Sequence, residues 1–264
     1  MKANSLVVLL TDFGTADGYV AAMRGKILTV SQEIGIFDIS HQIPHHDLNH
    51  GAYVLNFTYA NFPKGTVFCV VIDPGVGSLR KAIVMATKDY LFVGPDNGVL
   101  WPAAQAEGDV KVYELPVPAT SSTTFHGRDV FAPAAARLAC EQLALHDLKE
   151  LLDWQRLDFG HPQKRDDGKW QGAIQTVDHF GNVITNFKKE DWGAEFGNEG
   201  FTLEVGKTTI SKLYQCYDEA QGEEIFCIWG SGGFLEISKD QASAALAMGL
   251  QRRKAWPGVL LSLP

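Results

Sequence analysis

One buried strand, with the polar turn that ends it, constrains this chain more than any other stretch. The segment Phe68–Arg80, FCVVIDPGVGSLR, opens within the apolar run Val67–Ile72, which predicts a strand buried on both faces. Asp73 and Pro74-Gly75 end the strand, because Pro lacks a ladder donor and Gly permits a positive φ. Open α/β sheets bind ligands at the carboxyl ends of such strands. Asp73 and Arg80 are therefore candidate site residues, although a turn-capping Asp and a surface Arg would give the same local pattern.

The size and composition of the chain indicate a globular protein of two domains. Its 264 residues suffice for two domains of about 100–200 residues each. Hydrophobic residues make up 45% and charged residues 20%, a balance that argues against disorder. The polar stretch Asp153–Lys169 is the expected linker. We therefore expect an N-terminal domain over residues 1–160 and a C-terminal domain over residues 168–264.

The composition and the N-terminal sequence indicate which partners and which cellular compartment to expect. The net charge of −8 argues against a nucleic-acid partner, because phosphate binding needs a basic field. The apolar run Leu6–Leu10 is too short for a signal peptide or a membrane span. We therefore expect a cytoplasmic protein with no membrane partner. Four scattered cysteines fit the buried thiols of a reducing compartment: Cys69, Cys140, Cys216 and Cys227.

The first strand, Ser5–Leu10, also ends in acids. Asp12 and Asp17 lie in the loop before Val20–Val30, which has helical spacing. Two carboxylates in such a loop can accept the hydroxyl protons of a ribose diol, although capping of the helix by either acid is a common alternative. No GxGxxG motif is present, so the usual dinucleotide-binding fold is not supported.

Histidines are concentrated after a second short strand, Ile34–Ile39. This composition can ligate a metal, but no HExxH or comparable spacing is present. We expect a helix over Asp47–Tyr59, with the histidines in the loop before it and in its first turn. Solvated loop histidines, or one that lines a ligand, are the favoured interpretation over a metal site for His41, His45, His46 and His50 with Asp47.

A further histidine, His126, precedes the apolar helix expected in FAPAAARLACEQLAL. A histidine at that place is suited to general acid–base chemistry or to contact with an anion. A capping or core histidine is an equally good interpretation of the local sequence.

Beyond the linker, short strands alternate with Gly-rich turns and few helices, which predicts a small antiparallel barrel or sandwich. Two loops are candidates for binding. Asp178–Asn182 carries an acid, an aromatic ring and an amide, and Gly230–Gly233 offers backbone N–H groups to a carboxylate. Ordinary hairpin turn chemistry would also explain both loops.

Six motifs occur in order between residue 11 and about residue 237: TDFGTADGYV, DPGVGSLR, GPDNG, TFHGRD, DHFGNVITN and GSGGFLEIS. Together they resemble the S-adenosyl-L-methionine (SAM) hydroxide adenosyltransferase family, which is related to the fluorinating and chlorinating enzymes. The resemblance implies an N-terminal α/β domain with a mainly parallel sheet, followed by a C-terminal antiparallel β-barrel. It also implies a homotrimer that binds SAM between neighbouring subunits. Water or hydroxide attacks the ribose C5′, giving adenosine and methionine without a metal or cofactor.

Individual roles follow from matching motifs. Asp73, Arg80 and His126 match the family's catalytic Asp, Arg and His. Asp12 matches the ribose-binding acid, and Asp178 matches the acid that holds the methionine ammonium. His46 stands where relatives carry an aromatic ring that packs over the ligand. The full set implied for substrate binding is Asp12, Asp17, Tyr19, His46, Phe125, Asp178, Phe180, Asn182 and Ser231.

Two other functions remain open from sequence. One is a metal-dependent hydrolase that uses the His41–His50 cluster, and the other is a non-catalytic adenosine-binding module on the same fold. A halogenase is disfavoured, because the Asp73 carboxylate would repel a halide that has lost its water.

Overall fold

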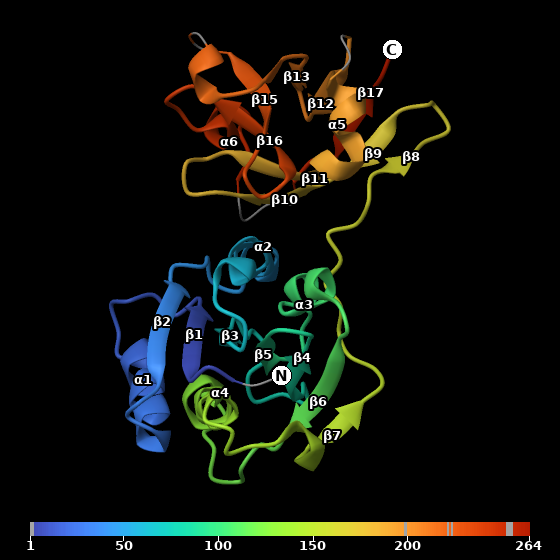
Figure 1. Ribbon diagram of the computed structural model, residues 1–264. Coiled ribbons are helices and arrows are strands. Elements are labelled where there is room, and N and C mark those ends of the chain that lie inside the picture. Colours follow the sequence, from blue (N-terminus) through green and yellow to red (C-terminus); the bar gives the residue numbers. More distant parts are fainter. Residues whose placement is uncertain (1–2, 198–199, 221, 223, 252–255) are drawn as a thin grey trace. The chain divides into compact units, whose positions relative to one another are not determined.

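The computed structural model describes residues 3–197, 200–220, 222, 224–251 and 256–264 (Figure 1). The chain divides into two compact units, Met1–Asp158 and Phe159–Pro264. Their boundary lies within the polar stretch 153–169. Among the described residues, no helix is both long and apolar enough to cross a membrane.

The first unit is built on a seven-stranded sheet of order β2-β1-β3-β5-β4-β6-β7. β2, β1, β3 and β5 pair in parallel, whereas β4, β6 and β7 continue the sheet in antiparallel fashion. The expectation of a mainly parallel central sheet is therefore confirmed. The strands are β1 (Leu6–Thr11), β2 (Gly35–Ser40), β3 (Val67–Val71), β4 (Ala82–Ala86), β5 (Leu91–Pro95), β6 (Lys111–Leu115) and β7 (Lys149–Leu151).

Helices cover both faces of this sheet. On one face, α1 and α4 bury Ile27 and Ala135 against Leu9 of β1 and Cys69 of β3. Figure 1 shows α2 and α3 on the other side. A π-helical turn, Gly127–Phe131, leads directly into α4. The helices are α1 (Tyr19–Val30), α2 (Leu48–Thr58), α3 (Trp101–Glu107) and α4 (Ala132–Ala139), with short 3-10 turns at Tyr59–Asn61 and Leu145–Asp147.

The central strand β3 is buried at every position, as its continuous apolar run predicts. Its neighbours on both sides are parallel strands, with Leu9 of β1 opposite Cys69 and Cys69 opposite Val93 of β5. The carboxyl ends of β1 and β3 therefore lie side by side. This arrangement brings the loops that begin at Asp12 and Asp73 to the same edge of the sheet.

The second unit contains two five-stranded sheets, of order β10-β11-β16-β15-β14 and β13-β12-β17-β9-β8. All strand pairs are antiparallel except β14–β15. Between residues 159 and 264, no ladder in the described part of the chain closes either sheet into the expected barrel. The strands are β8 (Gln163–Lys164), β9 (Trp170–Gly172), β10 (Ile174–Val177), β11 (Val183–Lys188), β12 (Thr202–Val205), β13 (Thr208–Ile210), β14 (Leu213–Tyr214), β15 (Ile225–Trp229), β16 (Phe234–Lys239) and β17 (Val259–Ser262).

Both sheets of the second unit contribute to one apolar core. Phe187 of β11 and Ile237 of β16 share it with Leu203 and Leu261 of the other sheet. Trp192 and Phe196 enter this core from α5 (Lys189–Gly197), a helix that the sequence analysis did not predict. The remaining helical segments are α6 (Ala244–Ala247) and a 3-10 turn at Tyr217–Glu219.

Candidate functional site

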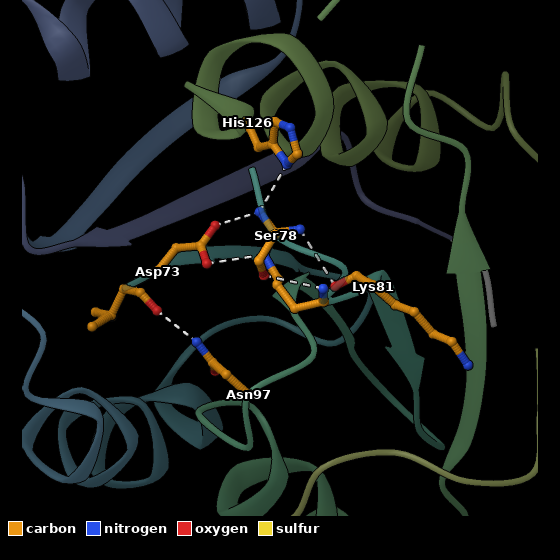
Figure 2. Close-up of polar contacts among 7 residues, drawn as sticks. Asp73, Ser78, Lys81, Asn97 and His126 are labelled. Atoms are coloured by element: carbon orange, nitrogen blue, oxygen red, sulfur yellow. Dashed lines mark hydrogen bonds and ion pairs between the residues drawn. The ribbon is translucent and has the colours of Figure 1, made fainter. Parts of the chain in front are cut away.

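Asp73, Arg80 and His126 form one continuous hydrogen-bonded group (Figure 2). Arg80 Nε donates to Asp73 Oδ1 at 2.9 Å, and Arg80 Nη2 donates to Asp73 Oδ2 at 2.5 Å. The same Nη2 lies 2.8 Å from His126 Nδ1. The Asp73 and Arg80 side chains are only 5% and 9% exposed, so the two charges compensate each other with little screening by solvent.

Local turn chemistry brings these three residues together. Asp73 follows the end of β3, and its loop approaches the segment before His126 so closely that a Cβ on Gly77 would lie 2.4 Å from the Thr123 carbonyl oxygen. Gly77 also has a φ of 76°, which favours glycine. The guanidinium of Arg80 lies over the Phe131 ring, 5.2 Å from its centroid. The loop from β3 is therefore held against the π-helical turn that carries His126.

The donor pattern assigns the tautomer of His126. A guanidinium can only donate, so Nδ1 of His126 accepts and the neutral ring carries its proton on Nε2. Burial, followed by the positive charge of Arg80, lowers the pKa of His126, while the charge of Asp73 opposes this. The ring is therefore neutral at pH 7 and presents one N–H donor.

Asp12 lies in a buried position directly after β1. Its Oδ2 accepts the backbone N–H of His46 at 2.9 Å, and its carbonyl oxygen lies 3.1 Å from His45 Nδ1. His46 has a φ of 65°, an uncommon conformation for a residue with a side chain. The bond to Asp12 stabilises this turn, whose next residue, Asp47, caps α2 by accepting the His50 N–H at 2.9 Å.

Phe13, the residue after Asp12, belongs to an aromatic group. The rings of Tyr19, Phe125 and Phe13 contact one another with centroids 5.2–5.8 Å apart, and Arg128 lies over Phe125. Tyr19 is half exposed and Asp17 is exposed. Tyr19 and Phe125 were predicted from sequence, whereas Phe13 was not, because a single Phe in a loop carries no distinguishing signal.

The candidate residues of the second unit lie in a tight hairpin between β10 and β11. Asp178 Oδ1 accepts the backbone N–H of Asn182 at 2.8 Å, and its Oδ2 accepts the side-chain amide of Asn182 at 2.9 Å. Phe180, at the tip, is 77% exposed. Among the described residues, the Asp178 carboxylate in this hairpin accepts hydrogen bonds only from neutral donors, and it lies near the exposed Phe180 ring in the sequence.

The second candidate loop, Gly230–Gly233, joins β15 to β16 and exposes Ser231. Beside it is a carboxyl group that sequence reasoning missed, Glu236 of β16, which is buried. A Cβ on Gly230 would lie 1.7 Å from Glu236 Oε1, so only glycine leaves room for this carboxyl. Tyr217 donates to Glu236 Oε2 at 3.4 Å. Burial, followed by the charge of Asp178, raises the pKa of Glu236 to about 7.

The histidine cluster does not converge on one point. The His41 ring contacts Thr11 and Asp38, whereas His45 contacts the Asp12 backbone. Throughout the described residues, no group of three or more His, Cys, Asp or Glu side chains is arranged to hold a metal ion.

The chain is similar to known proteins over most of its length. The family models for the SAM hydroxide adenosyltransferase N-terminal and C-terminal domains match residues 7–149 and 172–257. The (R)-S-adenosyl-L-methionine hydrolase of Methanocaldococcus jannaschii is 38% identical over 254 residues, which cover 91% of each chain. A fluorinase of Actinopolyspora mzabensis is 23% identical over 283 residues, which cover 93% of this chain and 94% of that enzyme.

A solved structure is similar across both units. The crystal structure of an uncharacterized conserved protein from Thermotoga maritima has a TM-score of 0.83 at 32% identity, covering 97% of this chain and 99% of that one. With both family models matched in order, the chain belongs to the SAM hydroxide adenosyltransferase family.

Proposed function

We propose that this chain is an enzyme that hydrolyses SAM to adenosine and L-methionine, without a metal or cofactor, by attack of water on the ribose C5′. The observation that carries the proposal is the buried Asp73–Arg80–His126 group at the end of β3. Homologues named (R)-S-adenosyl-L-methionine hydrolase support the substrate and the reaction.

The reaction needs positioning more than it needs acid catalysis. The sulfonium leaves as a neutral thioether, so methionine requires no proton. The water must lie in line with the breaking C5′–S bond, and such positioning can supply about 7–11 kcal/mol of the barrier. A rigid group of three hydrogen-bonded side chains is suited to hold one water in that geometry.

The assigned tautomer divides the roles within the group. His126 carries its proton on Nε2, so it can donate to the water oxygen but cannot accept the water's proton at Nδ1, which Arg80 occupies. Arg80 uses one site on each Asp73 oxygen, and a carboxylate has about four. Asp73 is therefore the proton acceptor: the O–C5′ bond forms, the C5′–S bond breaks, and the water proton passes to Asp73 and then to solvent.

Other residues are proposed to bind the substrate as the resemblance implies. Asp12 accepts from the ribose hydroxyls, and Asp178 accepts from the methionine ammonium. Aromatic rings contact the ligand from Tyr19, Phe125 and Phe180, with further contacts from Asp17, His46, Asn182 and Ser231.

Two further proposals concern assembly and location. We propose a homotrimer with its sites at the subunit interfaces. Leu79, next to Arg80, is fully exposed, and Phe180 is largely exposed. Apolar side chains that pack at a subunit interface are exposed in this way when one chain is considered alone. Light scattering tests this assembly, and an active monomer would contradict it. We propose a cytoplasmic location because the cysteines Cys69, Cys140, Cys216 and Cys227 are free thiols.

The test is incubation with SAM in oxygen-18 water in the presence of a chelator, followed by mass analysis of both products. We expect one label in the 5′-hydroxyl of adenosine and none in methionine. Unlabelled adenosine would contradict attack by water. Binding of adenosine without turnover would instead indicate the non-catalytic module, and activity lost with the chelator and restored by metal would indicate the metal-dependent hydrolase.

A further inference from the structure

A chain of polar contacts links Thr11, His41, Asp38 and Arg24 next to the Asp12 loop and has no part in the proposed reaction. Thr11 is the last residue of β1, and His41 directly follows β2; both are at least 95% buried. Thr11 Oγ1 forms a hydrogen bond with His41 Nδ1 at 2.8 Å, whereas His41 Nε2 lies 3.1 Å from Asp38 Oδ1 in a close polar contact without hydrogen-bond geometry. The other oxygen of Asp38 accepts from the Arg24 guanidinium of α1.

The contacts on the two sides of the His41 ring indicate where its proton lies. The negative charge of the Asp38 carboxylate, 3.1 Å from Nε2, favours the ring proton on Nε2. Nδ1 of the neutral ring is then an acceptor, and the Thr11 hydroxyl donates to it. Thr11 Oγ1 accepts in turn from the Phe13 backbone N–H at 3.3 Å. Burial, followed by the charge of Arg24, lowers the pKa of His41 and keeps its ring neutral.

These polar contacts hold the backbone on both sides of Asp12. Thr11 and Phe13, its neighbours, are held through the Thr11 hydroxyl. The Gly14 N–H also donates to the His41 carbonyl oxygen at 2.7 Å. His41 therefore contacts the loop on both sides of Asp12, in addition to the contacts that Asp12 itself makes with His45 and His46.

The order of hydroxyl, imidazole and carboxylate also occurs in nucleophilic triads. Here Thr11 has no exposed surface, so no substrate can reach its oxygen. A buried Thr11 can therefore act by holding neighbouring residues in position, but not as a nucleophile.

We propose that His41 and Asp38 are positioning residues for the Asp12 carboxylate, acting through Thr11, and that their task is to maintain the Nε2–H tautomer of His41. The expected effect on nucleoside binding at Asp12 depends on the proposed function, whereas the assignment of the His41 tautomer does not.

The tautomer is measured directly by two-bond proton–nitrogen correlation of the histidine rings at pH 7.5. We expect the His41 proton on Nε2 in the wild-type protein. In Asp38→Asn the Arg24 guanidinium can only donate, so we expect the Asn oxygen to face Arg24 and its NH₂ to face His41. The ring proton is then expected on Nδ1. A wild-type proton on Nδ1, or no change in Asp38→Asn, would overturn the proposal.

Adenosine binding by calorimetry tests the consequence at Asp12. Thr11→Val keeps the shape but leaves His41 Nδ1 without a donor and the Phe13 N–H without an acceptor, so we expect binding about 10-fold weaker. Thr11→Ser restores the hydroxyl and should bind within about 2-fold of wild type, as should the exposed control Thr29→Val. With SAM, KM should rise more than kcat falls.

Two results would contradict positioning: folded Thr11→Val that binds adenosine like wild type, or Thr11→Ser that loses as much as Thr11→Val. If Thr11→Val does not fold, Asp38→Asn decides, because its reversed Thr11 bond should also weaken adenosine binding about 5–10-fold. Wild-type protein that neither binds adenosine nor hydrolyses SAM would defeat the proposed function, and the ring measurements would still decide the tautomer.

Discussion

Two carboxylates that follow strand ends, one in each unit, differ in what compensates their charge. As whole residues, Asp73 and Asp178 are of similar, intermediate burial. The Asp73 carboxylate accepts two hydrogen bonds from a guanidinium, so that region is close to neutral. In the described part of the chain, the Asp178 carboxylate accepts only from the neutral N–H groups of Asn182. Its charge remains available, and it is the second cause, after burial, of the raised pKa of Glu236.

This difference in charge compensation suits Asp73 to a role in the reaction and Asp178 to a role in substrate binding. A neutralised, rigidly held carboxylate can orient a neutral water and accept its proton without attracting a competing cation. An uncompensated carboxylate is suited to hold an ammonium group. The pairing with Arg80 also weakens the charge repulsion that would disfavour a halide beside Asp73.

The largest expected effect is on turnover in Asp73→Asn, which keeps the size of the side chain but removes the proton acceptor. We expect single-turnover rates to fall by about 10²–10⁴-fold. Adenosine binding should stay within about 3-fold, because this side chain faces the water. Asp109→Asn, at an exposed position of the same unit, is the control and should react like wild type. Wild-type turnover in Asp73→Asn would remove Asp73 from the chemistry.

Removing the compensating charge should affect stability. Arg80→Ala leaves Asp73 buried without its partner, and we expect a loss of about 3–5 kcal/mol in the free energy of urea unfolding. Asp73→Asn added to Arg80→Ala should recover part of this loss. Lys149→Ala breaks the more exposed pair with Glu114 and should cost less than about 1 kcal/mol. Equal losses in the two single variants would show that the Asp73–Arg80 pair is not desolvated.

Glu236 should make stability depend on pH. Its folded-state pKa of about 7 lies above the usual value of 4.5, so the folded protein binds the proton more tightly than the unfolded chain. This contribution is present in full below about pH 4.5 and is lost as the pH rises to about 7, by up to about 3 kcal/mol. Glu236→Gln should flatten the unfolding free energy between pH 5 and 8, whereas exposed Glu190→Gln should not.

The smallest expected effect concerns binding through Asp178. Asp178→Asn removes the charge that we propose holds the ammonium, so the KM for SAM should rise about 10-fold with little change in kcat. Adenosine, which lacks the ammonium, should bind as it does to wild type. Asp166→Asn, exposed in the same unit, should change neither constant. An adenosine affinity that falls in parallel with SAM would show that Asp178 acts on the nucleoside end.

The sequence predicts best where one local signal decides the structure. The unbroken apolar run to Ile72 followed by Asp73-Pro74 specifies a buried strand and its end, and the structure has β3 there with Asp73 just beyond. The helical pattern predicts a helix over Asp47–Tyr59, and the structure has α2 over Leu48–Thr58 with Asp47 as its cap. The assignment of roles to Asp73, Arg80 and His126 came from ordered motifs and stays a prediction.

What sequence could not show depends on tertiary packing. Glu236 alternates with the inward-facing Leu235 and Ile237, a pattern typical of a solvent-facing acid, yet its face of the sheet is covered and it is buried. His41 was a possible metal ligand in the sequence because the residues that contact its ring cannot be read from sequence. They are Thr11 of β1 and Asp38 of β2. The expected barrel failed because strand count and turn spacing do not determine whether the last ladder closes.

The division between the two carboxylates is tested most directly by single-turnover rates of Asp73→Asn and Asp178→Asn measured side by side as the concentration of SAM is raised to saturation. Our account predicts that Asp178→Asn approaches the wild-type rate at saturation, whereas Asp73→Asn remains about 10²–10⁴-fold slower at every concentration. Recovery of Asp73→Asn at high SAM, or an equal and persistent defect in both variants, would contradict it.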